Sequence, residues 1–439
     1  MQSSHFRLAA SIAAALTVLT PAGAQAVQEP NTELVSVSSV EAPADHSSFH
    51  YMFHPGISAS GRFVAFTSEA SNLDPDDDDG RTDVFLRDRR LGTTQEVSVS
   101  VTEESVKPRS RYPAISADGQ VVSFYSSAHL VLVDANQAPD VFVRIPATGQ
   151  TERVSVSTEE AQANSGSYYS ALSKTGRYVA FVSYASNLVP DDTNGESDVF
   201  VRDRTLGTTE RVSVGLGGAE ANGTSESETL SISAGGRFVT FHSGASNLAV
   251  GDTDDNSDIF VYDRRTDVTS LVSVTSAGEN RPRWAGYPTM SADGSKVAFA
   301  SNSRLVPEDT DKRIDVYVHN LVSGKTVRAS VDSDGSAANG SSGYPAISGD
   351  GTAVCFYSAA TFSRLDPGNR QDIYLHRLNS GNTRLVTARL HENSRPGWSY
   401  YCGMNHDGSR VAFSSTSNDL VPEDSNSGAD VFLRTYPRP

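Results

Sequence analysis

One unit of about 58 residues repeats seven times along this chain, from Asn31 to Pro439. Each copy contains a glycine followed by a short apolar run, and successive glycines lie 57 to 60 positions apart. These glycines are Gly61, Gly119, Gly176, Gly236, Gly294, Gly351 and Gly408. Each copy also contains an aspartate that begins another apolar run: Asp83, Asp140, Asp198, Asp258, Asp315, Asp372 and Asp430. A fixed period of this size limits the chain to folds that are built from equivalent units.

Each copy contains four segments with the composition of β-strands and none with helical periodicity. In the first copy one segment ends at Ile57, and the others cover residues 62–66, 83–87 and 96–100. The second segment is apolar on both faces, which suits a strand between two layers. Valine and serine alternate in the fourth segment, which predicts a half-exposed outer strand. Short turns with Gly or Asp join the first segment to the second and the third to the fourth. The sequence therefore predicts an all-β fold, a seven-bladed β-propeller with four antiparallel strands per blade.

The two ends of the chain complement each other. The last copy stops after its third strand at residues 430–434, whereas residues 32–38 (TELVSVS) precede the first copy and match the fourth-strand pattern at residues 151–157 (TERVSVS). We expect residues 32–38 to pair into the last blade and close the ring, because this removes exposed sheet edges. A single propeller domain is expected over residues 27–439. Its blades are expected at approximately residues 50–100, 107–157, 166–215, 226–275, 284–331, 341–389 and 398–439.

The first 26 residues resemble a secretory signal peptide. They contain Arg7, an apolar stretch over residues 8–19 and small residues before Ala26, which predicts cleavage near Ala26 and a periplasmic or extracellular protein. No later segment has the ~20 apolar residues of a membrane-spanning helix, so membrane insertion is not expected. The net charge of −17 and the pI of about 5.0 argue against nucleic acid as the main partner.

The chain contains two cysteines, Cys355 in the second strand of the sixth copy and Cys402 in the first strand of the seventh. An oxidising compartment would permit a disulfide between adjacent blades. Bridging requires Cα atoms within about 7 Å, and we favour the alternative of two buried thiols that do not meet.

Several segments resemble a known family. The segments are YPAISADG at residues 112–119, SNLVPDDTNGESDVFVRDR at residues 186–204 and TERVSVS at residues 151–157. They resemble the TolB-like group of WD-related propeller repeats in secreted bacterial proteins. The resemblance covers all seven copies. It implies a propeller that serves as a binding scaffold.

In an antiparallel four-stranded blade, the loop between strands two and three and the loop to the next blade open on the same face. These two loops are also the long ones in every copy, so we expect binding residues on this face.

The first of these loops carries the pattern D-x-D/N-x-x-x-D in six copies. The residues are Asp77, Asp79 and Asp83; Asp134, Asn136 and Asp140; Asp192, Asn194 and Asp198; Asp252, Asp254 and Asp258; Asp309, Asp311 and Asp315; and Asp424, Asn426 and Asp430. The sixth copy has Asp366 and Asp372 with Gly368 between them. Closely spaced oxygen ligands predict structural Ca²⁺ in at least one loop. The alternative, which we favour, is that these side chains only cap turns by accepting backbone N–H groups.

The second loop carries aromatic and basic residues toward the axis. The candidate ligand-binding residues are Arg109, Arg111, Tyr112, Tyr169, Arg281, Arg283, Trp284, Tyr287, Tyr344, Arg395, Trp398 and Tyr401. Aromatic faces with arginines suit a peptide, a sugar or an anionic group. For Tyr112, Tyr287 and Tyr344 we favour a different role, packing against the neighbouring blade in every repeat.

No catalytic motif of the G-x-S-x-G, H-E-x-x-H or C-x-x-C type occurs. His46, His50, His54 and His391 match no compact metal-ligand spacing, so we favour solvated loops over a metal site for these histidines. The first hypothesis is a non-enzymatic propeller that binds a protein, peptide or glycan through its long-loop face. The alternative is a carbohydrate-active lyase or hydrolase with its site at the axial mouth.

Overall fold

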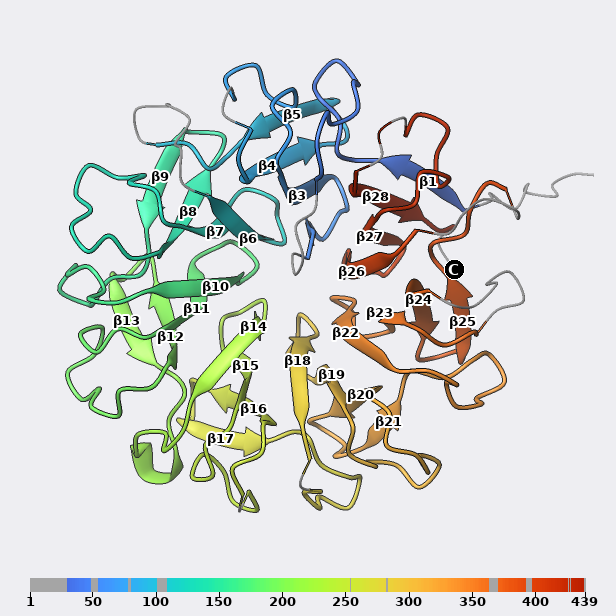
Figure 1. The fold of residues 1–439 in the computed structure, drawn as a ribbon. Coiled ribbons are helices and arrows are strands. Elements are labelled where there is room, and N and C mark those ends of the chain that lie inside the picture. Colours follow the sequence, from blue (N-terminus) through green and yellow to red (C-terminus); the bar gives the residue numbers. More distant parts are fainter. Residues whose placement is uncertain are drawn as a thin grey trace, which may run out of the picture.

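The computed structural model describes residues 30–48, 54–77, 80–100, 109–252, 254–281, 283–362, 370–391, 397–424, 426 and 428–437. Over these residues, 28 strands form seven four-stranded antiparallel sheets around one axis (Figure 1). The predicted seven-bladed β-propeller is therefore confirmed. In the described part of the chain, no helix is long and apolar enough to cross a membrane. The predicted signal peptide lies outside the described residues.

The blades follow each other in chain order. Blade 1 contains β2 (Gly56–Ile57), β3 (Phe63–Ser68), β4 (Asp83–Asp88) and β5 (Thr93–Glu96). Blade 2 contains β6 (Ser110–Ile115), β7 (Val122–Ser126), β8 (Asp140–Ile145) and β9 (Gln150–Arg153). Blade 3 contains β10 (Ser167–Leu172), β11 (Tyr178–Ser183), β12 (Asp198–Asp203) and β13 (Thr208–Arg211), and a short 3₁₀ helix, η1 (Leu216–Gly218), follows it.

Blade 4 contains β14 (Ser225–Ile232), β15 (Phe238–Ser243), β16 (Asp258–Asp263) and β17 (Val268–Leu271). Blade 5 contains β18 (Ala285–Met290), β19 (Lys296–Ser301), β20 (Asp315–Asn320) and β21 (Thr326–Arg328). Blade 6 contains β22 (Ser342–Ile347), β23 (Ala353–Ser358), β24 (Asp372–Arg377) and β25 (Asn382–Leu385). Blade 7 contains β26 (Ser399–Met404), β27 (Arg410–Ser415), β28 (Asp430–Thr435) and β1 (Asn31–Leu34).

The N-terminal strand closes the ring as predicted. β1 pairs antiparallel with β28, with Asn31 opposite Thr435 and Leu34 opposite Phe432. Figure 1 shows this strand, in blue, as the outer strand of the red last blade. The first and last blades are thereby joined through the sheet itself, and β28 is not left as an exposed edge.

The outer strands are shorter than predicted. β5 ends at Glu96, and the following residues 97–100 are all buried, so the prediction of a half-exposed alternating segment was wrong. The reason is the serine of this segment. Ser98 Oγ accepts the N–H of Val84 at 3.0 Å and donates to the carboxylate of Asp83 at 2.9 Å, which holds the serine inside the blade.

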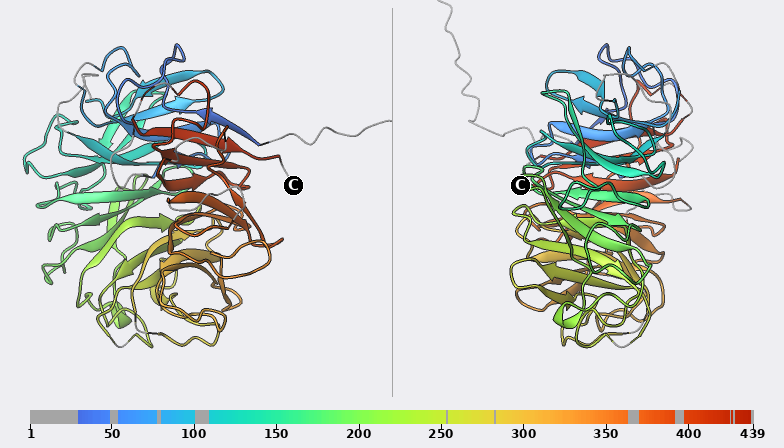
Figure 2. Two further views of the ribbon diagram at one scale, coloured as in Figure 1. Left: turned by 45° about the vertical axis from the view of Figure 1, so that its right-hand side comes forward. Right: turned by 90° about the vertical axis from the view of Figure 1, so that its left-hand side faces the viewer.

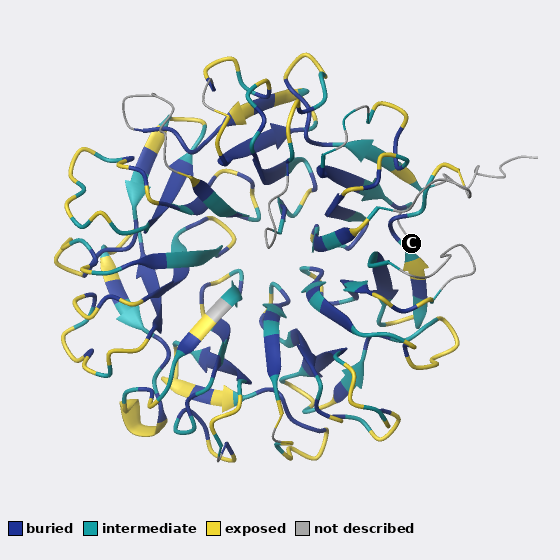
Figure 3. Cartoon of the chain, in the orientation of Figure 1, coloured by how far each residue is buried: buried dark blue, intermediate teal, exposed yellow. Residues whose placement is uncertain are grey.

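The core lies between adjacent blades, where the second and third strands are buried (Figure 3). In every blade, an aromatic residue of the second strand pairs with one of the third, at ring-centroid distances of 5.7 to 6.3 Å. These pairs are Phe66–Phe85, Phe124–Phe142, Phe181–Phe200, Phe241–Phe260, Phe299–Tyr317, Phe356–Tyr374 and Phe413–Phe432. One repeated apolar pattern therefore supplies the same cross-strand aromatic pair to the core of every blade.

The repeated turn glycine sets the contact between blades. Gly236 has a φ of +74°, and a Cβ at this position would lie 2.1 Å from the ring of Tyr178 in blade 3. Only glycine combines this backbone conformation with this close approach.

The two cysteines form a disulfide between β23 and β26, with Cα atoms 6.4 Å apart. The favoured prediction of two separate thiols was therefore wrong. The inner strand of blade 7 lies directly beside the second strand of blade 6. The sequence alone does not fix the distance between these two strands.

The long and short connections lie on opposite faces of the ring. Turns of only a few residues join β2 to β3 and β4 to β5, whereas β3 to β4 and β5 to β6 are joined by much longer segments. Figure 2 shows the ring from the side, as a body that is flatter than it is wide. The long loops therefore surround one mouth of the axial channel.

Candidate functional site

The inner strands carry β-bulges at this mouth. The register of β6 against β7 shifts between Arg111 and Ala114, and β10, β18, β22 and β26 are shifted at equivalent positions. A tyrosine with positive φ occupies the bulge in four blades: Tyr112 (54°), Tyr169 (40°), Tyr287 (58°) and Tyr344 (45°). This conformation costs a non-glycine residue about 1–3 kcal/mol and persists only where the surrounding structure imposes it. Bulges re-aim side chains, and here they bring tyrosines from different blades together.

The rings of neighbouring blades contact each other across the mouth. Tyr287 and Tyr344 stack with centroids 3.8 Å apart, and the Tyr344 hydroxyl donates to that of Tyr287 at 2.8 Å. Tyr401 of blade 7 lies 4.6 Å from Tyr344, edge-on. Tyr112 and Tyr169 form a second edge-on pair at 4.7 Å. These tyrosines are half-buried or nearly buried, so they contact neighbouring blades as expected, but they do so at the axis.

Blade 4 interrupts this series of rings. Between Glu226 and Ser231, β14 has two more residues in its bulge than the other inner strands, and Thr229 stands where the other blades have an aromatic ring. The two extra residues bring Glu228 to the wall of the axial cavity. Sequence reasoning missed this residue, although the spacing of 60 between Gly176 and Gly236 marked the insertion.

The Glu228 carboxyl group is electrostatically coupled to the tyrosines around it. Burial, and then the neighbouring Glu226 carboxylate, raises the pKa of Glu228. Burial, and then the charge of Glu228, raises the pKa of Tyr169 to about 12. The same two effects contribute to the raised pKa values of the tyrosines of four other blades: Tyr112, Tyr287, Tyr344 and Tyr401. Glu228 therefore lies close to the axis, among side chains from most of the ring.

In blade 1, His54 occupies the inner-strand position at which five other blades have a tyrosine. It lies 4.6 Å from Tyr401 between ring centroids, and its Nδ1 is 3.5 Å from the carbonyl oxygen of Cys402. Burial lowers the pKa of His54 to about 4, so the imidazole is neutral at pH 7. The interpretation of His54 as a solvated loop residue was therefore wrong. His46 and His391 are exposed on the surface beside Asp45 and Asp419, and His50 lies outside the described residues.

Below the rings, the axial cavity has a volume of about 270 Å³. Its walls are the inner strands, with Ile57, Ile115, Leu172, Met290, Ile347 and Met404 among the lining residues. Among the described residues that line it, Glu228 is the only one with a charged side chain. The mouth thus combines aromatic faces and one carboxylate above an apolar channel.

The predicted arginines and tryptophans that the structure describes do not join the axial ring. Arg109, Arg281 and Arg283 are exposed. Trp398 is 41% exposed, with the Arg370 guanidinium 5.5 Å from its ring. Trp284 contacts Tyr287 edge-on at 5.5 Å. Arg111 interacts with Tyr125, whose ring stacks with that of Tyr112, and Arg395 lies outside the described residues.

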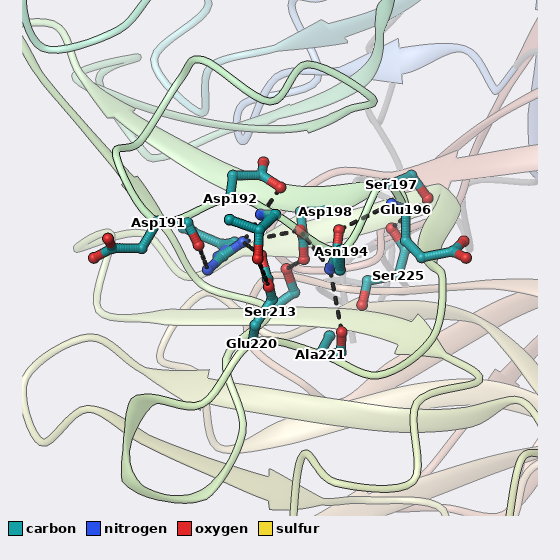
Figure 4. Close-up of polar contacts among 12 residues, drawn as sticks. Asp191, Asp192, Asn194, Glu196, Ser197, Asp198, Ser213, Glu220, Ala221 and Ser225 are labelled. Carbon is teal, nitrogen blue, oxygen red and sulfur yellow. Dashed lines mark hydrogen bonds and ion pairs between the residues drawn. The ribbon is translucent and has the colours of Figure 1, made fainter.

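The acidic loops form a second candidate site, repeated around the same face. Figure 4 shows the loop of blade 3, where Asp192, Asp198 and Glu220 converge. Arg211 Nη1 lies 3.5, 3.3 and 2.8 Å from their carboxylate oxygens, in that order. Burial, and then the charge of Asp198, raises the pKa of Asp192 to about 6.

The second and third motif positions have hydrogen-bond partners that recur from blade to blade. The third aspartate accepts a hydroxyl hydrogen bond from the fourth-strand segment in all seven blades, donated by Ser98, Ser155, Ser213, Ser273, Ser330, Thr387 and Ser36. The second residue accepts the N–H two positions ahead, as in an Asx turn, at Asn136, Asn194, Asp254, Asp311 and Asn426. Turn capping is therefore present at the second position, whereas the third aspartate binds a serine or threonine hydroxyl.

The blades differ at the fourth-strand residue that faces the carboxylates. This residue is Arg153 in blade 2, Arg211 in blade 3 and Arg328 in blade 5, and each lies within 4.0 Å of two aspartates. In the same register, opposite Phe260, blade 4 has Leu271. Blade 4 therefore has three carboxylates and lacks the arginine that offsets their charge in the other three blades.

The oxygen atoms of the blade 4 cluster could hold a metal ion. One carboxylate oxygen each from Asp252, Asp254 and Asp258 lies within 4.8 Å of the others. Asn280 donates to Asp258 at 3.2 Å, and the Asn280 Oδ1 atom is buried without a hydrogen bond. Burial raises the pKa of Asp258 to about 6. In blade 5, by contrast, the hydroxyl of Tyr317 donates to Asp309 at 2.5 Å, and blade 4 has Phe260 at that position.

The remaining loops are described in part. Asp79 in blade 1, and Asp366 and Gly368 in blade 6, lie outside the described residues. In blade 1, Asp77 and Asp83 are buried, and Glu96 occupies the position of the arginine. In blade 7, burial and then Asp430 raise the pKa of Asp424 to about 7.

No family model matches this sequence, and no curated protein matches it. Among solved structures, an oligogalacturonate lyase in complex with manganese superposes with a TM-score of 0.53 and 11% identity, over 93% of this chain and 96% of that chain. The β-propeller domain of the Trilobed protease from Pyrococcus furiosus, described as having an open velcro topology, gives a TM-score of 0.52 and 11% identity, over 89% of this chain and 100% of that chain. At such identities these likenesses show the propeller fold alone.

TolB from Acinetobacter baumannii gives a TM-score of 0.41 and 14% identity, over 74% of this chain and 66% of that chain. This TM-score does not place the chain in the TolB-like group, and that resemblance stays a prediction.

Proposed function

We propose that this protein is a secreted or periplasmic, non-enzymatic propeller that binds a protein, peptide or glycan segment at the axial mouth of its long-loop face. The observation that carries the proposal is the convergence of side chains from all seven blades over one cavity. Five blades contribute a tyrosine to the mouth, two of which line the cavity itself, and four of the five tyrosines have a strained backbone that the sheet imposes. Strained residues of this kind cluster at functional sites.

The chemistry of the mouth suits recognition. Tyrosines offer large, rigid faces and a polar hydroxyl, which bind extended polymer segments at low entropic cost. His54 is neutral and its Nδ1 faces a backbone carbonyl, an arrangement that orients an imidazole without activating a nucleophile. The disulfide between Cys355 and Cys402 supports an oxidising compartment.

Arrays of peptides and glycans, probed with the wild-type protein and two variants, test this proposal. Tyr169→Leu removes a ring at the axis, whereas Trp398→Leu removes an exposed ring from an outer loop. We expect Tyr169→Leu to weaken binding at least tenfold and Trp398→Leu to change it less than threefold. Binding that depends on Trp398 and not on Tyr169 would place the site elsewhere. Release of unsaturated or reducing ends from a polysaccharide, lost in Glu228→Gln, would favour the lyase or hydrolase alternative.

We further propose that the loop of blade 4 holds a structural Ca²⁺ ion. Hard oxygen ligands at this spacing suit calcium. Because blade 4 has Leu271 at the position of the arginine in blades 2, 3 and 5, no arginine offsets the charge of its carboxylates. Asp254→Asn introduces the residue that blades 2, 3 and 7 have at this position, and Asp311→Asn makes the same change in blade 5. We expect equilibrium dialysis to show one fewer bound Ca²⁺ in Asp254→Asn and no loss in Asp311→Asn. Equal stoichiometry in all three proteins would contradict the proposal.

A further inference from the structure

Glu228 lacks a cationic partner among the described residues that line the cavity. No hydrogen bond or ion pair within the described ranges involves its carboxylate, although other partly buried carboxylates of this protein are paired. Asp88, Asp203 and Asp263 lie 2.5 to 2.7 Å from the guanidinium groups of Arg62, Arg177 and Arg237. Glu228 is half-buried at the mouth of the cavity, and its carboxylate is therefore available to a ligand that enters there.

The groups around Glu228 favour positive charge. Six rings surround the mouth: His54, Tyr112, Tyr169, Tyr287, Tyr344 and Tyr401. The face of an aromatic ring is negative and attracts a cation within about 6 Å of its centroid. His54 contributes no positive charge because its imidazole is neutral. Of the described arginines that the sequence suggested for this site, Arg109, Arg281 and Arg283 are exposed, and Arg111 interacts with Tyr125 and does not line the cavity.

The channel below suits an alkyl chain. Its wall is formed by apolar side chains such as Ile115, Leu172 and Met290, and Glu228 stands at its upper end. An anionic ligand would be repelled by Glu228, and a neutral sugar can donate hydroxyl hydrogen bonds to the carboxylate but supplies no opposite charge. A cationic head on an alkyl stem satisfies both the carboxylate and the apolar wall, because long basic side chains bury their stems along apolar surface.

From this arrangement we propose that the axial mouth binds an organic cation, an ammonium or guanidinium group on an alkyl stem, as presented by a lysine or arginine side chain of a peptide. Glu228 pairs with the charged group and the tyrosine faces surround it. The inference rests on the proposed function, because it names the ligand class of the same mouth.

Two matched hexapeptides test the charge requirement. One has lysine at its centre, and the other has norleucine, which keeps the stem and replaces the ammonium group by a methyl group. We expect isothermal titration calorimetry to show at least tenfold tighter binding of the lysine peptide by the wild-type protein. Butyltrimethylammonium, as a competitor, distinguishes a peptide side chain from a free quaternary ammonium compound. If butyltrimethylammonium displaces the lysine peptide at a lower concentration than Nα-acetyl-lysine amide does, the site binds a free quaternary ammonium compound. Such a compound still belongs to the proposed ligand class.

A matched pair of variants tests the carboxylate. Glu228→Gln removes the charge at the axis, whereas Glu226→Gln removes the same charge from the exposed end of β14, where Glu226 accepts from the Tyr184 hydroxyl at 2.5 Å. We expect Glu228→Gln to weaken binding of the lysine peptide at least tenfold and Glu226→Gln to weaken it less than threefold. Melting temperatures within a few degrees of wild type exclude a folding defect, and Glu228→Asp, which keeps the charge, is expected to retain measurable binding.

Equal binding of the two peptides, or an unchanged affinity in Glu228→Gln, would overturn the inference. If the arrays instead identify a neutral or anionic ligand whose binding needs Tyr169, the proposed function stands and the cation inference fails. If no ligand depends on either Tyr169 or Glu228, both fail.

Discussion

At the scale of the residue, single substitutions give nearly identical blades different chemistry. The third strand presents an arginine in blades 1 to 3, at Arg87, Arg144 and Arg202, and each donates to a fourth-strand threonine. Blades 5 and 6 have histidines at this position. His376 Nδ1 lies 2.8 Å from Thr383 Oγ1, and the side chain is buried. The same location therefore holds a permanent cation in some blades and a titratable group in others.

His376 predicts a pH dependence of stability. Burial lowers its pKa in the folded protein to about 4, from an ordinary value of 6.5. Between these two values the unfolded chain binds more protons than the folded protein, so stability falls as pH falls through this window and is unaffected above it. For His376→Gln, which cannot titrate, we expect the loss between pH 7 and pH 4.5 to be smaller by about 2 kcal/mol. Urea unfolding at the two pH values measures this difference, and parallel losses in both proteins would contradict it.

At the scale of the element, the inner strand determines what each blade shows at the axis. Its bulge sets the direction of one side chain, and in β14 Thr229 takes the position of the ring while two extra residues bring Glu228 to the cavity wall. The same strand in blade 7 carries Cys402, which links β26 to β23 of blade 6. Blades 6 and 7 are thus the covalently joined pair.

The disulfide is expected to stabilise the ring. It joins residues that are 47 positions apart, and a crosslink over such a loop restricts the unfolded chain by about 4 kcal/mol in the chain-entropy model, with typical measured values of about 2–4 kcal/mol. Both cysteines are buried, so reductant should act slowly on the folded protein. We expect the double variant Cys355→Ala/Cys402→Ala to lose stability of this size in urea unfolding. A double variant as stable as the wild type would show that the bond is absent in solution.

At the scale of the whole molecule, closure of the ring depends on four residues at one end. β1 covers the edge of β28, and Ser36 donates to Asp430 at 2.6 Å as its equivalents do in the other blades. The N-terminal segment therefore completes both the sheet and the repeated hydroxyl contact of blade 7.

Removal of this segment is expected to open the ring. A chain that begins at Val40 lacks β1 and Ser36, whereas a chain that begins at Asn31 keeps them. We expect the shorter chain to lose its single cooperative unfolding transition and to aggregate, because β28 becomes an exposed edge. Calorimetry and light scattering of the two chains measure this effect. An unchanged melting temperature in the shorter chain would show that closure by β1 does not support the fold.

Fold and closure could be predicted because they depend on period and composition. The spacing of Gly61 and its equivalents, the apolar second strands and the match between residues 32–38 and 151–157 are properties that every blade repeats. The acidic motif was equally visible. Its partners were not, because Arg211 and Leu271 face these carboxylates only through the strand register.

The sequence by itself determined seven equivalent units and the order of their strands, since local pattern and turn residues are enough to specify a repeated sheet. Only the tertiary structure decided which residues meet at the axis. His54, Glu228 and Tyr401 are separated by more than 170 positions from one another, and they come together because ring closure places the start of every inner strand around a single channel. Contacts between distant repeats depend on the geometry of the closed ring, and this geometry is not written in any one repeat.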